Sequence, residues 1–418
     1  MKDLGDAELA RLRARITDLG ARLKPASERR QREDEAPPRG ERPRWRWREE
    51  VAGLVVLFVV TRVVLAVIGV VSRELVPGHV ARPDPLGVGP SFSSFSFLDI
   101  WGEWDSSWYL SIAEYGYKAV PLEGPFANYA FFPLFPLLSR WVGWLVGGPY
   151  IGGLVVANAA FVVACVFLYR LVAIDDGAGT ARRSVKYLFA APAAFLFSAM
   201  LSESLYLALA VMCFYFARTR RWWAVGVAGF LLALSRAPGV LVVIPLLWMY
   251  MAQRRFSLRR VRPDVLWLAL FPAGVCVFMW VNEVLTGDAL AFARIQTTAW
   301  GHRLRDPVSS LWGSLTGDDL FWRLNAWYVV AVLVFTVVFV RRFSAVYLVF
   351  VVVSLVPPMS TSVWYSMIRY TAVIFPLYVV AARVTDSRPR LDQALTVASG
   401  LLQGFLMSQW VNNSLLVV

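Results

Sequence analysis

Long apolar runs alternate along the chain with short clusters of arginine and lysine. The first run, residues 51–71, has the length of about 20 residues that a membrane-spanning helix needs. It follows Arg44, Arg46 and Arg48, and basic residues beside a span stay in the cytoplasm, so this span is predicted to lead outward. Later basic clusters are expected on the cytoplasmic side as well, at 182–186, 218–221, 254–262, 341–342 and 383–390.

An even number of spans must therefore separate neighbouring clusters, which predicts an all-α polytopic membrane protein with about eleven transmembrane helices in residues 51–418. The expected spans are residues 51–71, 151–174, 187–200, 205–217, 222–234, 238–251, 265–285, 326–340, 344–356, 371–384 and 391–407. Residues 131–146 contain Pro133 and Pro136 and are expected to insert only halfway. Two outer loops result, residues 72–150 with juxtamembrane helices and residues 286–325.

The first 50 residues differ in composition from the rest of the chain. They mix basic and acidic side chains with Pro37, Pro38 and Pro43, and they lack the apolar segment of a secretory signal peptide. A charged, mostly disordered cytoplasmic tail is therefore predicted for residues 1–50.

Composition agrees with a membrane protein. The 418 residues are 58% hydrophobic and 17% charged, whereas soluble proteins average about 45–50% apolar and about 25% charged residues, so a soluble enzyme is excluded. The net charge of +13 lies in short loops between apolar runs, which favours anionic lipid headgroups over nucleic acid as a partner.

Cysteine and histidine chemistry is sparse. Three cysteines lie within apolar runs, which leaves neither a disulfide framework nor a CxxC metal site. The two histidines, His79 and His302, are too isolated for a His-based zinc site or a Ser/His/Asp triad. No cofactor or metal is expected, and any proton transfer must use a carboxylate.

The most informative segment is residues 98–117. Treated as one helix with about 100° per residue, it places aromatic and polar side chains on opposite faces, Trp101, Trp104, Trp108, Ile112 and Tyr115 against Glu103, Ser107, Ser111 and Glu114. This pattern predicts an interfacial amphipathic helix. Asp105 falls on the aromatic face, where a carboxylate needs a partner or a task, such as that of a general base. Alternatively, Asp105 caps a helix whose tryptophans form an interfacial belt.

Further charged residues are predicted at outer turns. Glu203 and Arg236 lie at the outer ends of pairs of short spans, and Arg369 lies where the layout again reaches the outside. Either Glu203 and Arg236 form a structural salt bridge, or the outer arginines bind an anion such as a phosphate, which suits the guanidinium group. The chain has no glycine-rich nucleotide loop, so a nucleotide-sugar donor has no evident site.

Five motifs together carry a family resemblance. In chain order they are WDSSWYLSIAEYGY, FFPLFPLL, FLFSAMLSESLYLAL, LSRAPGVL and RYTAVIFPLY. They resemble the bacterial relatives of the PIG-V type (GPI mannosyltransferase 2) membrane mannosyltransferases. The resemblance covers residues 98–378 and implies a GT-C fold, a polyprenyl-phosphate sugar as donor, and inverting transfer on the non-cytoplasmic side without a nucleotide.

The same resemblance assigns site residues. It implies that Asp105 is the catalytic base, and that the donor and acceptor are bound by residues from the same motifs, namely Trp104, Trp108, Tyr109, Glu203, Arg236, Arg369 and Tyr370. No metal ligand is implied.

The expected function is transfer of mannose from polyprenyl-phosphate mannose to a lipid-linked or cell-envelope glycan at the extracytoplasmic face of the plasma membrane. Two alternatives share the basic outer groove and stay open: a transporter or flippase for lipid-linked sugars, and a non-catalytic subunit of a glycan-assembly complex. The sequence has no internal repeat, which disfavours a transporter.

Overall fold

The computed structural model describes residues 47–76, 91–117 and 127–417. These residues form an all-α structure without a sheet, and a single isolated bridge pairs Leu304 with Thr361. The α-helices are α3 (Trp47–Leu75), α4 (Ser96–Asp99), α5 (Ser106–Tyr115), α6 (Leu134–Val146), α7 (Pro149–Ala190), α8 (Glu203–Arg218), α9 (Trp222–Ser235), α10 (Val243–Ala252), α11 (Leu270–Thr286), α12 (Ala291–Thr298), α13 (Pro307–Thr316), α14 (Leu320–Val338), α15 (Ala345–Met359), α16 (Met367–Ala372), α17 (Pro376–Thr385) and α18 (Pro389–Val411).

Short 3₁₀ helices connect several of these elements: η1 (Asn128–Ala130), η2 (Ala194–Phe197), η3 (Ala237–Val242), η4 (Leu258–Arg260), η5 (Pro263–Ala269), η6 (Val340–Arg342) and η7 (Leu415–Val417). The predicted charged tail, residues 1–50, falls outside the described residues except for the first turn of α3.

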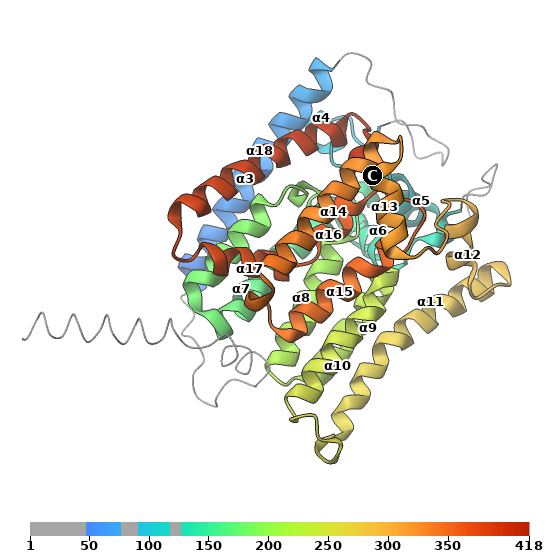
Figure 1. Ribbon diagram of the computed structural model, residues 1–418. Coiled ribbons are helices and arrows are strands. Elements are labelled where there is room, and N and C mark those ends of the chain that lie inside the picture. The colour runs from blue at the N-terminus through green and yellow to red at the C-terminus, as the bar shows by residue number, and fades with distance from the viewer. Residues whose placement is uncertain (1–46, 77–90, 118–126, 418) are drawn as a thin grey trace, which may run out of the picture.

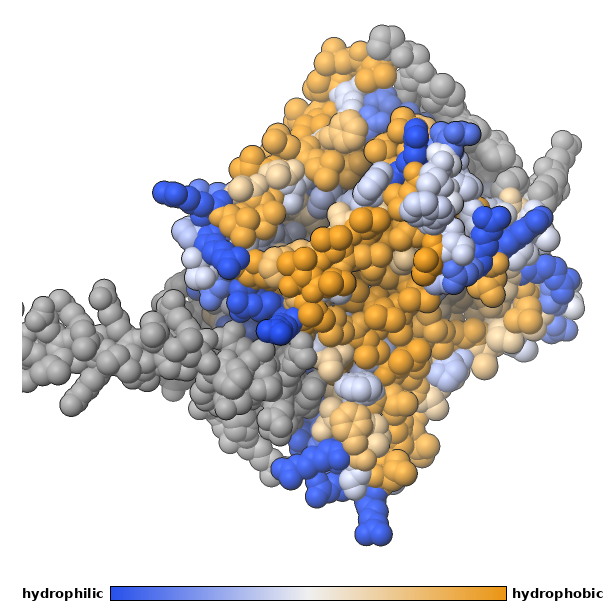
Figure 2. Space-filling view, in the orientation of Figure 1, coloured by the Kyte–Doolittle hydropathy of each residue, from blue (hydrophilic) through white to orange (hydrophobic). Residues whose placement is uncertain are grey.

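Four helical segments among the described residues are long and apolar enough to cross a membrane. They lie at Ala52–Leu75, Pro149–Ala190, Pro263–Thr286 and Leu320–Val338. Shorter apolar helices accompany them at Leu134–Val146, Trp222–Ser235, Ala237–Ala252 and Ala345–Met359. Figure 2 shows a broad apolar surface across the visible face, with hydrophilic residues gathered at its margins, as expected of a multi-pass membrane protein.

Three segments that were each predicted as one continuous helix are interrupted in the structure. Residues 187–200 are not one helix, because the helical segment that follows the kink at Gly177 (φ 81°) ends at Ala190, after which the chain turns through η2. Residues 371–384 are split between α16 and α17, where Pro376 begins a new helix because proline cannot donate a hydrogen bond to the preceding turn. Residues 98–117 form α4 and α5 with a break between them.

Helices α7 and α8 form the centre of the molecule (Figure 1). Almost every residue of α8 is buried, including its first residue, Glu203, and its last, Arg218. Helix α7 packs against α6, α8 and α17, while α3 and α18 lie side by side at one edge. A helix that is apolar on all sides and buried in this way belongs to the interior of a helical bundle.

Ion pairs gather at the C-terminal end of α8. Arg218 binds Asp175 and Arg383 binds Asp176, each at 2.8 Å, directly before the bend of α7 at Gly177. Basic residues that were predicted to share one side of the membrane therefore meet at one end of the bundle, and Glu203 lies at the other end of α8.

Helices α6 and α7 approach closely through glycine. A Cβ atom on Gly152 would lie 2.5 Å from the amide nitrogen of Gly143 and closer still to the carbonyl oxygen of Ser139. Real Cβ atoms do not approach backbone this closely, so only glycine allows the two helices to pack at this distance.

Replacement of Gly152 tests this contact. We expect Gly152→Ala to lower the unfolding free energy by about 1–3 kcal/mol, because the methyl group forces α6 and α7 apart. The matched control is Gly400→Ala in α18, where a Cβ meets nothing within 4 Å and alanine is the better helix former. Thermal unfolding in detergent measures both, and equal melting temperatures for the two variants would contradict the contact.

Candidate active site

Asp105 and Arg369 form an ion pair between segments far apart in sequence. Asp105 precedes the first turn of α5, Arg369 lies in α16, and the distance from Oδ2 to Nη1 is 2.6 Å. The Arg369 side chain is only 4% exposed, whereas the Asp105 side chain is 25% exposed. Asp105 is therefore the member of the pair that a substrate can reach.

Glu203 connects this pair to a second arginine. One oxygen, Oε1, accepts hydrogen bonds from Nε of Arg369 and from Nη1 of Arg236, and the carboxylate is fully buried. Its other oxygen, Oε2, has no hydrogen-bond partner among the described residues. A buried carboxylate of this kind is held in its charged form by cations at contact distance, and it holds both guanidinium groups in return.

Tyrosine side chains surround the two arginines. The guanidinium carbon of Arg236 lies 5.6 Å from the ring centroid of Tyr370, at cation–π distance. The buried Tyr109 shares a hydrogen bond of 2.8 Å with Ser202, the residue before Glu203. Asp105, Glu203, Arg236 and Arg369 form the charged cluster of this site, which contains two cations and two carboxylates and is neutral overall.

Unusual backbone conformations place these side chains. Trp104, in the break between α4 and α5, has a positive φ of 51° directly before Asp105. The carbonyl oxygen of Trp101 accepts from the Met200 amide at 2.9 Å, so a distant segment takes the place of the helical partner. Ser366 has φ 66° just before α16. Non-glycine residues rarely adopt positive φ, and such positions are concentrated at functional sites.

A second ion-pair group holds this segment against α3. Arg73, in the last turn of α3, binds Asp99 at 2.7 Å and Glu103 at 2.5 Å. None of the sequence motifs predicted this ion-pair group. The sequence nevertheless contains an indication of it. Arg73 is a cation at the outer end of the first predicted span, where positively charged residues are rare.

The polar face predicted for residues 98–117 is wrong. Glu103, Ser107 and Ser111 are buried, and Tyr115, from the predicted aromatic face, is 50% exposed. The polar residues face protein because Arg73 neutralises Glu103, an interaction that helical periodicity cannot reveal.

Trp108 belongs to a group of aromatic rings beside Asp105. It stacks on Phe131 with ring centroids 5.6 Å apart, and it meets Trp300 edge-on at 5.7 Å. Trp104 and Trp108 are both half-buried. Trp108, Phe131 and Trp300, which we call the aromatic cluster, join α5, the segment of Phe131 and the loop that follows α12.

The structure thus brings most of the predicted residues together. Asp105, Glu203, Arg236 and Arg369 are linked directly, and Tyr109 and Tyr370 pack beside them. The salt bridge between Glu203 and Arg236 forms, as one of the two sequence interpretations proposed. Arg294 does not join the cluster, since it pairs with Asp288 at 2.9 Å. His79 lies outside the described residues.

His302 lies in the loop between α12 and α13, close enough to Asp105 for an electrostatic interaction. Burial disfavours the charged imidazolium and lowers the pKa of His302 from its ordinary value of 6.5, while the Asp105 carboxylate opposes this effect. His302 is therefore neutral at pH 7.

Comparisons with known proteins give no assignment: no protein-family model matches the chain, and no curated protein matches it. Within the described ranges, no group of three His, Cys, Asp or Glu side chains is placed to hold a metal ion. The site must accordingly be interpreted from its own chemistry.

Removal of the Glu203 charge tests the electrostatic role of this residue. We expect Glu203→Gln to lower the unfolding free energy by about 3–5 kcal/mol, because the buried Arg369 and the largely buried Arg236 lose their shared carboxylate. Glu283→Gln, at an exposed glutamate of α11, is the control and should leave the melting temperature in detergent unchanged. Equal stability of the two variants would show that Glu203 does not hold the arginines.

Titration of His302 gives a pH dependence. Because its pKa is lowered in the folded state, the unfolded state binds more protons once the pH falls below about 6.5, and stability is lost as the pH falls further. We expect the melting temperature of the wild type to fall more steeply between pH 7.5 and pH 5 than that of His302→Gln. Parallel pH profiles for the two proteins would show that His302 titrates normally.

Proposed function

We propose that the protein is an inverting glycosyltransferase of GT-C type, with about eleven transmembrane helices, that transfers mannose from polyprenyl-phosphate mannose to a lipid-linked or cell-envelope glycan. The site faces the extracytoplasmic side of the plasma membrane. The position of the charged cluster at the end of α8 opposite Arg218 and Arg383 supports this proposed orientation, because basic residues favour the cytoplasmic side.

The observation that carries the proposal is a partly exposed carboxylate fixed at the edge of a buried charged cluster. Asp105 is 25% exposed, while its partner Arg369 is 4% exposed and is itself held by Glu203. A general base must be accessible to the substrate and rigidly placed, and Asp105 meets both requirements.

In the proposed reaction, an acceptor hydroxyl oxygen bonds to the anomeric carbon of mannose as the bond from that carbon to the donor phosphate oxygen breaks. The hydroxyl proton passes to Asp105, and the electron pair of the broken bond leaves with the polyprenyl phosphate. Attack from the face opposite the leaving group inverts the anomeric centre.

The departing phosphate gains negative charge, and Arg236 and Arg369 are suited to stabilise it. Each guanidinium group has five N–H donors, and Glu203 and Asp105 occupy only part of this set. Since Glu203 fixes both arginines before substrate binds, little reorganisation is needed when charge develops in the transition state.

Substitution of the base gives the decisive experiment. Purified wild type and Asp105→Asn are incubated with labelled polyprenyl-phosphate mannose and a lipid and glycan extract of the source cells, with Asp318→Asn as an exposed aspartate control. We expect Asp105→Asn to lose about 10²–10⁴-fold in transfer, because the amide cannot accept the proton, while the control keeps wild-type activity.

Three readouts separate the alternatives. Thermal unfolding shows whether Asp105→Asn still folds. Undiminished transfer by this variant would remove Asp105 from the mechanism. Donor binding without transfer by the wild type would instead favour a transporter or a non-catalytic subunit.

A further inference from the structure

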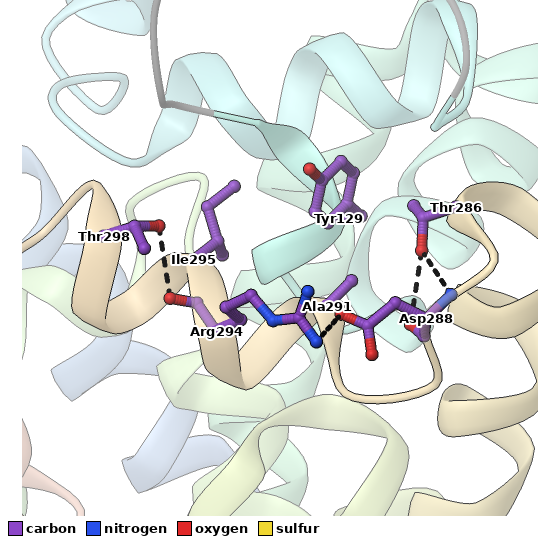
Figure 3. Close-up of a pocket in the computed structure, with 7 residues that line it drawn as sticks. All are labelled: Tyr129, Thr286, Asp288, Ala291, Arg294, Ile295 and Thr298. Carbon is purple, nitrogen blue, oxygen red and sulfur yellow. Dashed lines mark hydrogen bonds and ion pairs between the residues drawn. The ribbon is translucent and has the colours of Figure 1, made fainter.

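A pocket lies beside the proposed active site, in a part of the molecule that the proposed reaction does not use. It has a volume of about 220 Å³ and lies between Tyr129 of η1, the end of α11 and the face of α12 that carries Ala291 and Ile295. Figure 3 shows Arg294 pointing across the pocket toward Asp288, with Tyr129 on the opposite wall. Pockets for drug-sized ligands measure about 300–1,000 Å³, so this one suits a single ring.

We propose that this pocket binds a neutral sugar ring of the acceptor glycan, an inference that rests on the glycosyltransferase function proposed above. The occupant is recognised by its hydroxyl groups and not by charge.

The charges that line the pocket cancel. Arg294 and Asp288 form an ion pair with Nη2 and Oδ2 2.9 Å apart, and their side chains are 68% and 25% exposed. An anionic ligand would be attracted by Arg294 but repelled by the adjacent Asp288. A neutral polyhydroxylated ring can use both, because neighbouring hydroxyls donate to the carboxylate and accept from the guanidinium group.

The remaining lining is also suited to a sugar. Tyr129 offers a phenol hydroxyl, and Thr298 adds a second hydroxyl, which donates to the carbonyl oxygen of Arg294 at 3.2 Å and can still accept a hydrogen bond. Ala291 and Ile295 are buried and form an apolar floor on one side of α12. A sugar ring likewise has polar edges and an apolar face. Its hydroxyl groups can bind the polar side chains of the pocket, and its apolar face can pack on the apolar floor.

Both walls of the pocket continue into the aromatic cluster beside Asp105. Tyr129 lies two residues before Phe131, and Thr298 lies two residues before Trp300. Phe131 and Trp300 both contact Trp108, which follows Asp105 by three residues in α5. A glycan seated in the pocket can thus extend over aromatic rings, which pack well against apolar sugar faces, toward the proposed base.

Binding and kinetics together test this pocket. Saturation-transfer NMR measures binding of methyl α-mannoside, methyl α-glucoside and methyl α-galactoside to the full-length protein in nanodiscs. We expect saturable binding of at least one glycoside to the wild type, weakened about tenfold or more in Arg294→Ala and reduced in Tyr129→Phe, which removes only the phenol hydroxyl.

The control is Arg303→Ala, an exposed arginine on the following loop that does not line the pocket, and it should bind as the wild type does. Asp105→Asn should also bind normally, since the pocket does not include the base. Absence of saturable binding by all three glycosides, or binding unaffected by Arg294→Ala, would overturn the proposal.

Steady-state kinetics separates this proposal from the function on which it rests. If the wild type transfers mannose, Arg294→Ala should raise the KM for the acceptor about tenfold and leave kcat and the donor KM unchanged. An unchanged acceptor KM would overturn the pocket and leave the transferase standing. Glycoside binding at the pocket without any transfer by the wild type would overturn the transferase function and leave the sugar-binding pocket standing.

Discussion

The buried carboxylate of Glu203 is the interaction on which the rest of the site depends. It is the first residue of α8, at the centre of the helical bundle, and one of its oxygens holds Arg236 and Arg369 together. Neither arginine could be buried here without an opposite charge, because an isolated guanidinium group in an apolar interior is costly. Helices α8 and α16 and the junction between α9 and η3, which supply these residues, are therefore fixed relative to one another by electrostatics as well as by packing.

This arrangement explains how a loop segment positions the Asp105 carboxylate, the proposed base. Arg369 is anchored by Glu203, and Asp105 is in turn anchored by Arg369 at 2.6 Å, so the position of the exposed carboxylate is set by groups that solvent cannot reach. Asp105 directly follows the break between α4 and α5, in which Trp104 has a positive φ of 51°. Arg73 holds the other side of the same break through Glu103.

The charged cluster and the pocket at Arg294 suit different substrates. The proposed donor carries a charged phosphate, whereas the proposed acceptor is a neutral sugar. Both are charge-balanced, but the cluster is largely buried and holds two arginines in one network, which suits a phosphate, whereas the pocket is open, has a single arginine and is bordered by hydroxyl groups. The aromatic cluster connects the two sites. Trp108 follows Asp105 in α5 and contacts Phe131 and Trp300, which follow the pocket residues Tyr129 and Thr298 in the chain. A donor phosphate and an acceptor sugar would thus meet at Asp105 from two chemically distinct surfaces.

Sequence by itself determined the all-α membrane architecture and the residue types of the site, because apolar run length and the distribution of arginine reflect the membrane directly. Motif order singled out Asp105, Glu203, Arg236 and Arg369, although 264 positions separate Asp105 from Arg369. Only the tertiary structure decided the break at Trp104, the burial of Glu103 by Arg73, the bend of α7 at Gly177 and the pocket beside α12. Each of these depends on partners distant in the chain, and local periodicity contains no information about such partners.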